Sequence, residues 1–272
     1  MLIRFGCALE FECTQVTPMI LNLNVHYSRA SDLVRPDNLI MEPSVPMSAC
    51  RDVFGNWRTR TVAPPGRFRV STDGLIRDTG EPDGVFPYAF EHAVDTLPDE
   101  TLPFLLPSRY CETELLAPVA SSLFGSVTPG WTRVEAVCAF VNQHISFDYQ
   151  AARSTKTAWE AYNERRGVCR DYTHLAIALC RGLNIPARYC RGYLPDIGVP
   201  MMPFPADFAS WMEVYLAGSW HTFDPCHQEQ RIGRVLIARG QDAADAAASM
   251  TFGPNVLKCL KVFTNEVQQV AA

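Results

Sequence analysis

One segment constrains this chain more than any other, because it joins a glycine turn to an apolar helix that begins at a cysteine. The segment runs from Arg165 to Pro186, and Cys169 follows Gly167 by two residues. Gly182 and Pro186 mark the expected end of the helix. Helix N-termini favour the thiolate form of a cysteine, so Cys169 is a candidate nucleophile. The competing interpretation is a buried structural cysteine, since free cysteines are commonly buried.

The composition is that of an ordinary globular protein and excludes several classes of function. The 272 residues are 47% hydrophobic and 19% charged, with a formal net charge of -5. This length suffices for one large domain or two modest ones. Because no basic stripe occurs, a nucleic-acid partner is not expected. No apolar run approaches the roughly 20 residues that span a bilayer, and Glu10 and Glu12 interrupt the stretch that a signal peptide would need.

Ten cysteines are scattered along the chain without a Cys-x-x-Cys pair. A chain of this length without an export signal needs no disulfides to build a core, so we expect a cytoplasmic protein with buried thiols, Cys169 apart. We expect no metal, because Cys226-His227 is one adjacent pair with no second pair at ligand spacing. We expect no cofactor, because phosphate-binding and dinucleotide-binding motifs are absent.

The patterning along the chain divides it into two regions and a connection. Residues 1–92 contain alternating stretches such as Leu21 to Tyr27, separated by turn motifs such as Thr72-Asp-Gly, which predicts an antiparallel β-sandwich or barrel. Residues 93–116 include three prolines and are expected to connect the two regions. Residues 117–272 mix helical and strand periods and are expected to form the second domain.

Within the second region, two segments predict a helix and a hairpin. Apolar residues from Val134 to Ile145 recur at helical spacing, which predicts a helix with one buried face. The stretch from Trp211 to Asp224, with Ala217-Gly218 at its centre, predicts a β-hairpin with a two-residue turn. In that register Tyr215 pairs with Trp220, Glu213 with Thr222, and Trp211 with Asp224, so that Asp224 shares a sheet face with the residues around Trp211.

Five blocks of sequence, in this order, resemble the core of the bacterial transglutaminase-like proteins, which are also described as cysteine proteases. They are Arg166-Gly-Val-Cys-Arg-Asp-Tyr-Thr-His-Leu, Ile185-Pro-Ala-Arg-Tyr, Gly192-Tyr-Leu, Trp211-Met-Glu-Val-Tyr-Leu and Trp220-His-Thr-Phe-Asp-Pro. The resemblance implies an α+β fold with a papain-like core of helices on an antiparallel sheet. It also implies a hydrolase or acyl transferase that forms a thioester with a peptide or protein substrate. The strands before the core resemble the β-rich domain that commonly precedes it in bacteria.

The resemblance assigns a nucleophile and an acid but not a base. Cys169 falls on the nucleophile of the family and Asp224 on the acid of its triad. The family's histidine stands two residues before the tryptophan of a His-Ala-Trp motif, and this chain reads Ala209-Ser210-Trp211 there. Members of a catalytic triad act as a unit, so the loss of one removes most of the rate enhancement. The two open hypotheses are therefore an enzyme with an unusual base and a non-catalytic module that binds a peptide or protein on the same fold.

Two histidines near Asp224 are the candidates for a substitute base. Strand alternation places His221 on the face opposite to Asp224, and His227 follows in a loop whose geometry the sequence leaves open. We expect neither of them to serve as the base. Asp207 is a poor base for a thiol, because the usual pKa values are about 4 and about 8.5.

Trp211 and Trp220 are the candidate substrate-binding residues. As neighbours on the predicted hairpin they would form a wall of the substrate groove near Cys169. The alternative, which we favour, is that both rings pack within the hairpin.

Overall fold

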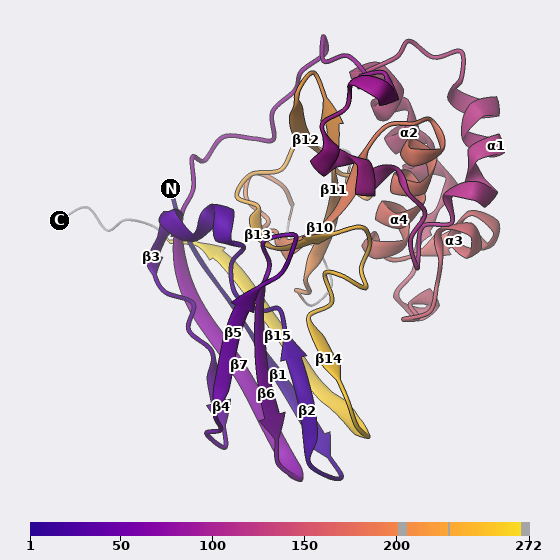
Figure 1. The fold of residues 1–272 in the computed structure, drawn as a ribbon. Helices are drawn as coiled ribbons and strands as arrows, with labels where there is room; N and C mark the ends of the chain where they lie inside the picture. Colours follow the sequence, from indigo (N-terminus) through magenta and orange to yellow (C-terminus); the bar gives the residue numbers. More distant parts are fainter. Residues whose placement is uncertain (201–205, 228, 268–272) are drawn as a thin grey trace.

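Two lobes make up the fold, one built from strands and one from helices around a smaller sheet (Figure 1). The computed structural model describes residues 1–200, 206–227 and 229–267. Four short 3-10 helices connect the larger elements. They are η1 (Tyr27–Asp32), η2 (Val94–Thr96), η3 (Asp99–Leu105) and η4 (Tyr149–Ala151). The combination of helices and antiparallel sheets confirms the predicted α+β class.

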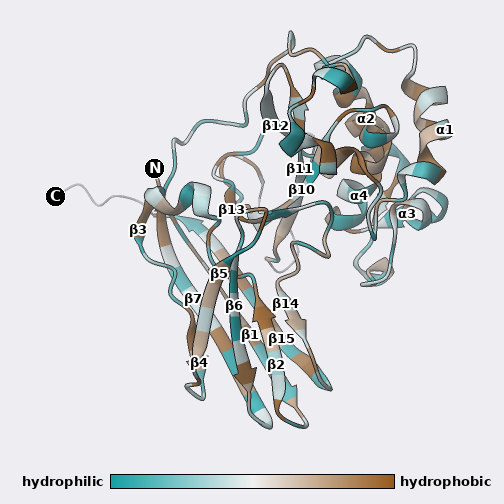
Figure 2. Cartoon of the chain, viewed as in Figure 1, coloured by the Kyte–Doolittle hydropathy of each residue, from teal (hydrophilic) through white to brown (hydrophobic). Residues whose placement is uncertain are grey.

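The first lobe is a pair of antiparallel sheets that share a core. One sheet has the order β15-β1-β7-β3, with β4 also paired to β7, and the other has the order β14-β2-β6-β5. The strands are β1 (Leu2–Cys13), β2 (Thr17–Leu21), β3 (Leu33–Arg35), β4 (Ile40–Glu42), β5 (Met47–Arg51), β6 (Trp57–Ala63), β7 (Gly66–Arg77), β14 (Ser249–Thr251) and β15 (Asn255–Glu266). Buried residues alternate with less buried ones along β6 and β7, and Figure 2 shows hydrophobic and hydrophilic residues interspersed along the strands. An alternation of this kind buries one face of a sheet.

The stretch that suggested this lobe is only partly a strand. Strand β2 ends at Leu21, and the buried Leu23 and Val25 follow it in irregular chain. Tyr27 is exposed and begins η1 instead of continuing the alternation. Leu23 and Val25 are buried although they lie outside a strand. The alternation of apolar residues therefore indicates burial and does not by itself establish a strand.

The second lobe packs helices against one face of a four-stranded antiparallel sheet. Its helices are α1 (Thr113–Phe124), α2 (Trp131–His144), α3 (Ala158–Glu164) and α4 (Cys169–Gly182), and its sheet has the order β12-β11-β10-β13, formed by β10 (Ala187–Tyr193), β11 (Ala209–Leu216), β12 (Ser219–Phe223) and β13 (Val235–Gly240). A parallel pair, β8 (Ser146–Phe147) and β9 (Arg166–Gly167), lies beside them. Helix α4 is central, because it packs against α1, α2, α3 and β11 and is buried over most of its length.

The predicted hairpin has the expected register over its described pairs. Tyr215 faces Trp220 and Glu213 faces Thr222. The turn residues Ala217 and Gly218 both have positive φ, 49° and 83°, as a two-residue hairpin turn requires. Strand β12 ends at Phe223, so the Asp224 side chain extends from the strand end into the following loop.

The end of the chain returns to the first lobe. Strand β15 pairs along β1, and β14 pairs with β2, and Figure 1 shows both among the sandwich strands. We expected residues 117–272 to form one unit. Because strand pairing places residues 249–266 in the sheets of the first lobe, we propose that the second domain ends near residue 248. None of the described helices has the length and apolar character needed to cross a bilayer.

Candidate active site

The turn before α4 fixes the position of Cys169. Arg166 and Gly167 pair with β8, and the Asp171 carboxylate then accepts a hydrogen bond from the Val168 backbone N–H at 3.0 Å. A Cβ atom on Gly167 would lie 2.5 Å from an Asp171 carboxylate oxygen, so only glycine leaves room for this cap. Cys169 begins α4, and its backbone N–H therefore has no acceptor within the helix.

The side chains that form and support this cap are charged, and two of them, Asp171 and Lys156, are buried. Asp171 is 1% exposed, and burial raises the pKa of its carboxyl although Arg170 and Lys156 lie beside it. Lys156 is completely buried, donates to the Arg166 carbonyl at 2.8 Å, and pairs with Glu164 at 3.0 Å. The turn that carries Cys169 is thus held from both sides by buried polar contacts, whose partners are costly to remove.

A second cysteine contacts the candidate nucleophile. The Sγ atoms of Cys169 and Cys226 lie 2.7 Å apart, and both are free thiols. Cys226 is one of the cysteines that we expected to be buried and structural, but it is only half-buried. The hydrogen bond with Cys169, together with burial, raises the pKa of the Cys226 thiol.

The loop after β12 brings His227 to the same place. A ring nitrogen of His227 lies within 4.8 Å of the sulfur atoms of Cys169 and Cys226. The Nδ1 atom of the same ring is 3.2 Å from Asp224 Oδ2, so Nε2 is the nitrogen left for the thiol. We expected His227 not to serve as the base, and its place beside the two sulfur atoms makes it a candidate for that role. The sequence could not settle it, because a loop conformation decides it.

Asp224 holds this loop in shape. Its Oδ1 accepts hydrogen bonds from the backbone N–H groups of Cys226 and His227 at 3.0 and 2.9 Å. Its Oδ2 accepts from Arg234 at 2.9 Å, and Arg234 also pairs with Asp83. Burial alone would raise the pKa of Asp224, but Arg234 and His227 outweigh it and hold this pKa well below its usual value. The carboxylate is therefore ionised and fixed.

The charge of Asp224 acts on His227 in turn. Burial lowers the pKa of His227, but the hydrogen bond and the charge of Asp224 outweigh it and raise this pKa above its usual value of 6.5. An imidazole of this kind accepts a proton readily near neutral pH, which is what a general base for a thiol requires.

The raised pKa of His227 predicts a pH-dependent stability. A folded-state pKa above the unfolded value contributes stability that is complete below about pH 6.5 and lost as the pH rises through the folded value. We expect His227→Gln to lower the free energy of unfolding more at about pH 5.5 than at about pH 9, measured by urea unfolding of both proteins at each pH. A loss that is equal at both values, or larger at the alkaline one, would contradict the pairing with Asp224.

The other histidines lie in packing positions. His221 Nε2 is 3.1 Å from the Leu216 carbonyl oxygen, and its ring packs on Phe86. His174 accepts a hydrogen bond from the Ala243 backbone N–H, and burial lowers its pKa to about 3. Three more histidines pack against aromatic rings, namely His26, His92 and His144.

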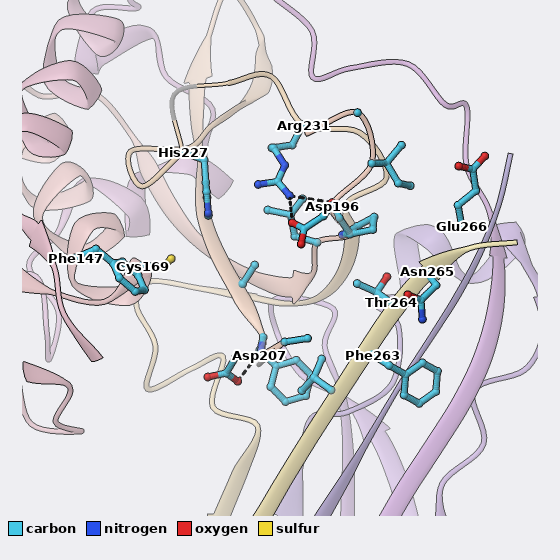
Figure 3. A pocket seen from close by; sticks show the side chains of 18 of the residues that line it. Phe147, Cys169, Asp196, Asp207, His227, Arg231, Phe263, Thr264, Asn265 and Glu266 are labelled. Carbon is cyan, nitrogen blue, oxygen red and sulfur yellow. Dashed lines mark hydrogen bonds and ion pairs between the residues drawn. The ribbon is translucent and has the colours of Figure 1, made fainter. Parts of the chain in front are cut away.

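The sulfur of Cys169 and the ring of His227 line one cavity of about 530 Å³. Figure 3 shows both side chains facing it, with the ion pair of Arg231 and Asp196 on the wall beyond His227. Ala209 also lines the cavity, so the position of the family's histidine borders the site without filling it. The volume is typical of a pocket that takes a small ligand or a few side chains.

Three further candidates from the sequence have other surroundings. Asp207 lines the cavity, burial raises its pKa, and it accepts a hydrogen bond from the Phe208 backbone N–H at 2.7 Å. Trp211 is 2% exposed, and Trp220 packs under Arg188, whose guanidinium lies 3.9 Å from the ring centroid. Among the described residues that line this cavity, neither tryptophan appears. Their environments fit the packing alternative better than a groove wall.

Two members of the site were not found from the sequence. Cys226 was counted among the structural cysteines, and Arg234 was not considered. Their contacts with Cys169 and Asp224 span 57 and 10 residues, and no local periodicity records such pairs. The adjacent Cys226-His227 was the available signal, but its relation to Cys169 depends on the loop.

Comparison with known proteins supports the fold. The family model of the transglutaminase-like superfamily matches residues 118–225, a span that holds Cys169 and Asp224 and ends before Cys226. The crystal structure of a "putative cysteine protease from Cytophaga hutchinsonii" matches with a TM-score of 0.84 and 27% identity, over 100% of this chain and 92% of that one.

A curated relative matches a shorter part of the chain. An uncharacterized protein of Mycobacterium leprae (strain TN) is 29% identical over 91 residues, and the chain spans about a third of its length, since the match covers 32% of each protein. The structural match extends over both lobes, and the family model covers α2, α3, α4 and the hairpin of β11 and β12. The chain therefore contains a core of the transglutaminase-like superfamily, at residues 118–225.

Proposed function

We propose that this protein is a thiol-dependent amide hydrolase or acyl transferase that acts on a peptide or protein substrate. Cys169 is the nucleophile, His227 is the base in place of the histidine missing at Ala209, and Asp224 orients His227. The observation that carries the proposal is the His227 ring, which is paired with a buried carboxylate and reaches within 4.8 Å of the Cys169 sulfur.

The arrangement supports acyl transfer in two steps. His227 Nε2 takes the thiol proton, and the Cys169 sulfur attacks the amide carbonyl carbon to form a tetrahedral intermediate. The backbone N–H of Cys169, at the helix start, is a donor for the oxyanion. The imidazolium returns the proton to the leaving amine as the C–N bond breaks, which leaves a thioester. Water or a second amine then attacks the thioester with His227 again as the base, and the thiol is released.

A binding role without catalysis is the alternative function. The observation in its favour is Ala209, which lines the cavity where the family places its histidine. Such a module would hold a peptide in the same cavity and leave Cys169 unmodified. The two functions differ in whether a covalent acyl-enzyme forms.

We also propose that the protein works in the cytoplasm. All ten cysteines are free thiols, and Cys50 is exposed on β5, contrary to the expectation that it is buried. Free thiols persist in a reducing compartment. Both proposed functions use the Cys169 thiol or its cavity in the reduced state.

Trapping the acyl-enzyme tests the proposed function. We expect p-nitrophenyl acetate to acetylate Cys169 faster than the other cysteines and the protein then to release acetate, because His227 assists both steps. Peptide mass spectrometry after a rapid acid quench locates the acetyl group, and absorbance follows p-nitrophenol. Cys169→Ala should abolish the fast phase, and Cys50→Ser, at an exposed thiol, should preserve it. Acetylation of Cys169 no faster than of Cys50, without turnover, would leave the binding module as the better account.

A further inference from the structure

Three donor atoms that suit zinc converge beside the cavity. The sulfur atoms of Cys169 and Cys226 and a ring nitrogen of His227 all lie within 4.8 Å of one another. We propose that these three side chains bind one zinc ion, or a similar divalent cation such as cobalt, and leave a fourth coordination position open to the cavity. The sequence argued against a metal because Cys226-His227 lacked a second pair, but the fold supplies Cys169 as the third ligand.

The donor set and its spacing suit this ion. Zinc takes thiolate sulfur at about 2.3 Å and imidazole nitrogen at about 2.0–2.1 Å, in a tetrahedral arrangement. Two sulfurs on one tetrahedral zinc are about 3.8 Å apart, whereas here they are 2.7 Å apart. Binding therefore moves them apart by about 1 Å, which a small rotation about the Cα–Cβ bond of either cysteine provides. Two thiols lose their protons as the ion binds, and the two thiolates then balance its charge.

The contacts of His227 resemble those of a histidine that binds a metal ion. A metal-binding histidine usually donates a hydrogen bond from its second ring N–H to a carboxylate, which fixes the tautomer and the ring plane. His227 Nδ1 has this contact with Asp224 Oδ2 at 3.2 Å, and Nε2 is left for an ion. The other oxygen of Asp224 accepts from the backbone N–H groups of Cys226 and His227. One buried carboxylate thus positions two of the three ligands.

The site is accessible from solvent. All three ligand residues are only half-buried, and Cys169 and His227 line the cavity of about 530 Å³. A water molecule or a carboxylate from a bound peptide has room to complete the coordination there. This open fourth position distinguishes the arrangement from a closed structural zinc site.

Binding of the ion would regulate the proposed enzyme. A bound ion takes up both the Cys169 thiolate and the His227 lone pair, so that neither is left for acyl transfer, and the metal-bound protein would be inactive. This regulatory role rests on the proposed function. The metal site itself does not, because it requires only the three ligands and Asp224.

Cobalt titration of the full-length, metal-stripped, reduced chain tests the site without an activity assay. We expect one Co²⁺ per chain, an intense near-ultraviolet thiolate-to-cobalt absorption band, and its loss when Zn²⁺ displaces the cobalt. Cys226→Ser should weaken Co²⁺ binding at least about 100-fold, because one of three protein ligands is lost. Asp224→Asn keeps all three ligands and should weaken it about 10- to 100-fold. Cys50→Ser, at an exposed thiol outside the site, should leave the affinity unchanged.

Two results would overturn the site: no thiolate band in the wild-type chain, or one-to-one binding of unchanged affinity in Cys226→Ser. Circular dichroism of each variant shows whether it is folded. If Cys226→Ser unfolds, the Co²⁺ affinity of Asp224→Asn tests the site instead. Acetylation of Cys169 in the metal-free wild-type chain is measured separately. Acetylation without metal binding refutes the metal site and leaves the proposed function standing. Metal binding without acetylation refutes the function and leaves the site.

Discussion

Replacement of His227 by glutamine is expected to slow acylation of Cys169, and release of the acyl group, by roughly 10²- to 10⁴-fold. Glutamine keeps a polar group near Asp224 but cannot accept the thiol proton, so both steps lose their general base. We expect so large an effect because the His227 ring is fixed close to the Cys169 sulfur. The ring is held by Asp224 at 3.2 Å, and the structure brings it within 4.8 Å of Cys169.

The measurement is the rate of p-nitrophenol release from p-nitrophenyl acetate by metal-free wild-type and His227→Gln proteins near neutral pH. His144→Gln is the matched control, because His144 Nε2 contacts the Tyr162 carbonyl oxygen at 2.7 Å and its ring stacks on Phe140, within the helical lobe. The control should stay within about twofold of wild type, as expected for a residue outside the reacting groups. A His227→Gln rate equally close to wild type would exclude His227 as the base and leave the thiol without one.

The elements that carry the site were predictable because their signals are local. The helix that begins at Cys169 has a glycine turn before it and a glycine stop after it, and α4 indeed runs from Cys169 to Gly182. The hairpin that delivers Asp224 has alternating residues and a turn dipeptide that accepts positive φ. Such patterns determine backbone conformation within a few residues, without tertiary contacts.

The contacts that decide the chemistry were not predictable in the same way. Whether His227 faces Cys169 depends on how the loop after Phe223 folds around Asp224, and this loop is organised by Arg234, which is held from the far side by Asp83. Asp83 precedes Arg234 by 151 residues. The return of β15 to the first lobe is a pairing of the same kind. A single sequence records the residues of such contacts but not their distances.

The structure changes how the alanine at position 209 is interpreted. The sequence alone made it the loss of a base, because the His-Ala-Trp motif was the reference. In the structure, Ala209 borders a cavity that His227 enters from another element, and Asp224 contacts His227 instead of a side chain on β11. Asp224, which the resemblance assigns as the acid, thus pairs with His227. This is why the proposed triad is read from the geometry and not from the motif.

Removal of the Asp224 carboxylate is expected to cost about 3–5 kcal/mol of stability in Asp224→Ala, because it breaks a buried ion pair. The side chains of Asp224 and Arg234 are 4% and 8% exposed, and the same change removes the acceptor of two backbone N–H groups in the loop. Urea unfolding at neutral pH measures the loss. Asp83→Ala is the matched control, since it removes the other partner of Arg234, is 21% exposed, and leaves the His227 contact in place. It should cost less than Asp224→Ala.

The pH dependence of this loss separates the ion pair from simple packing. The folded-state pKa of Asp224 lies below its usual value of 3.8, so its contribution is complete above that value and is lost as the pH falls toward the folded value. Below about pH 6, where the contribution of His227 is complete, the difference between wild type and Asp224→Ala should therefore be constant down to about pH 5 and shrink below about pH 4. A difference that stays constant at lower pH would mean that the variant loses packing alone. In that case Asp224 would hold the loop by shape, and the charge that raises the pKa of His227 would have to come from elsewhere.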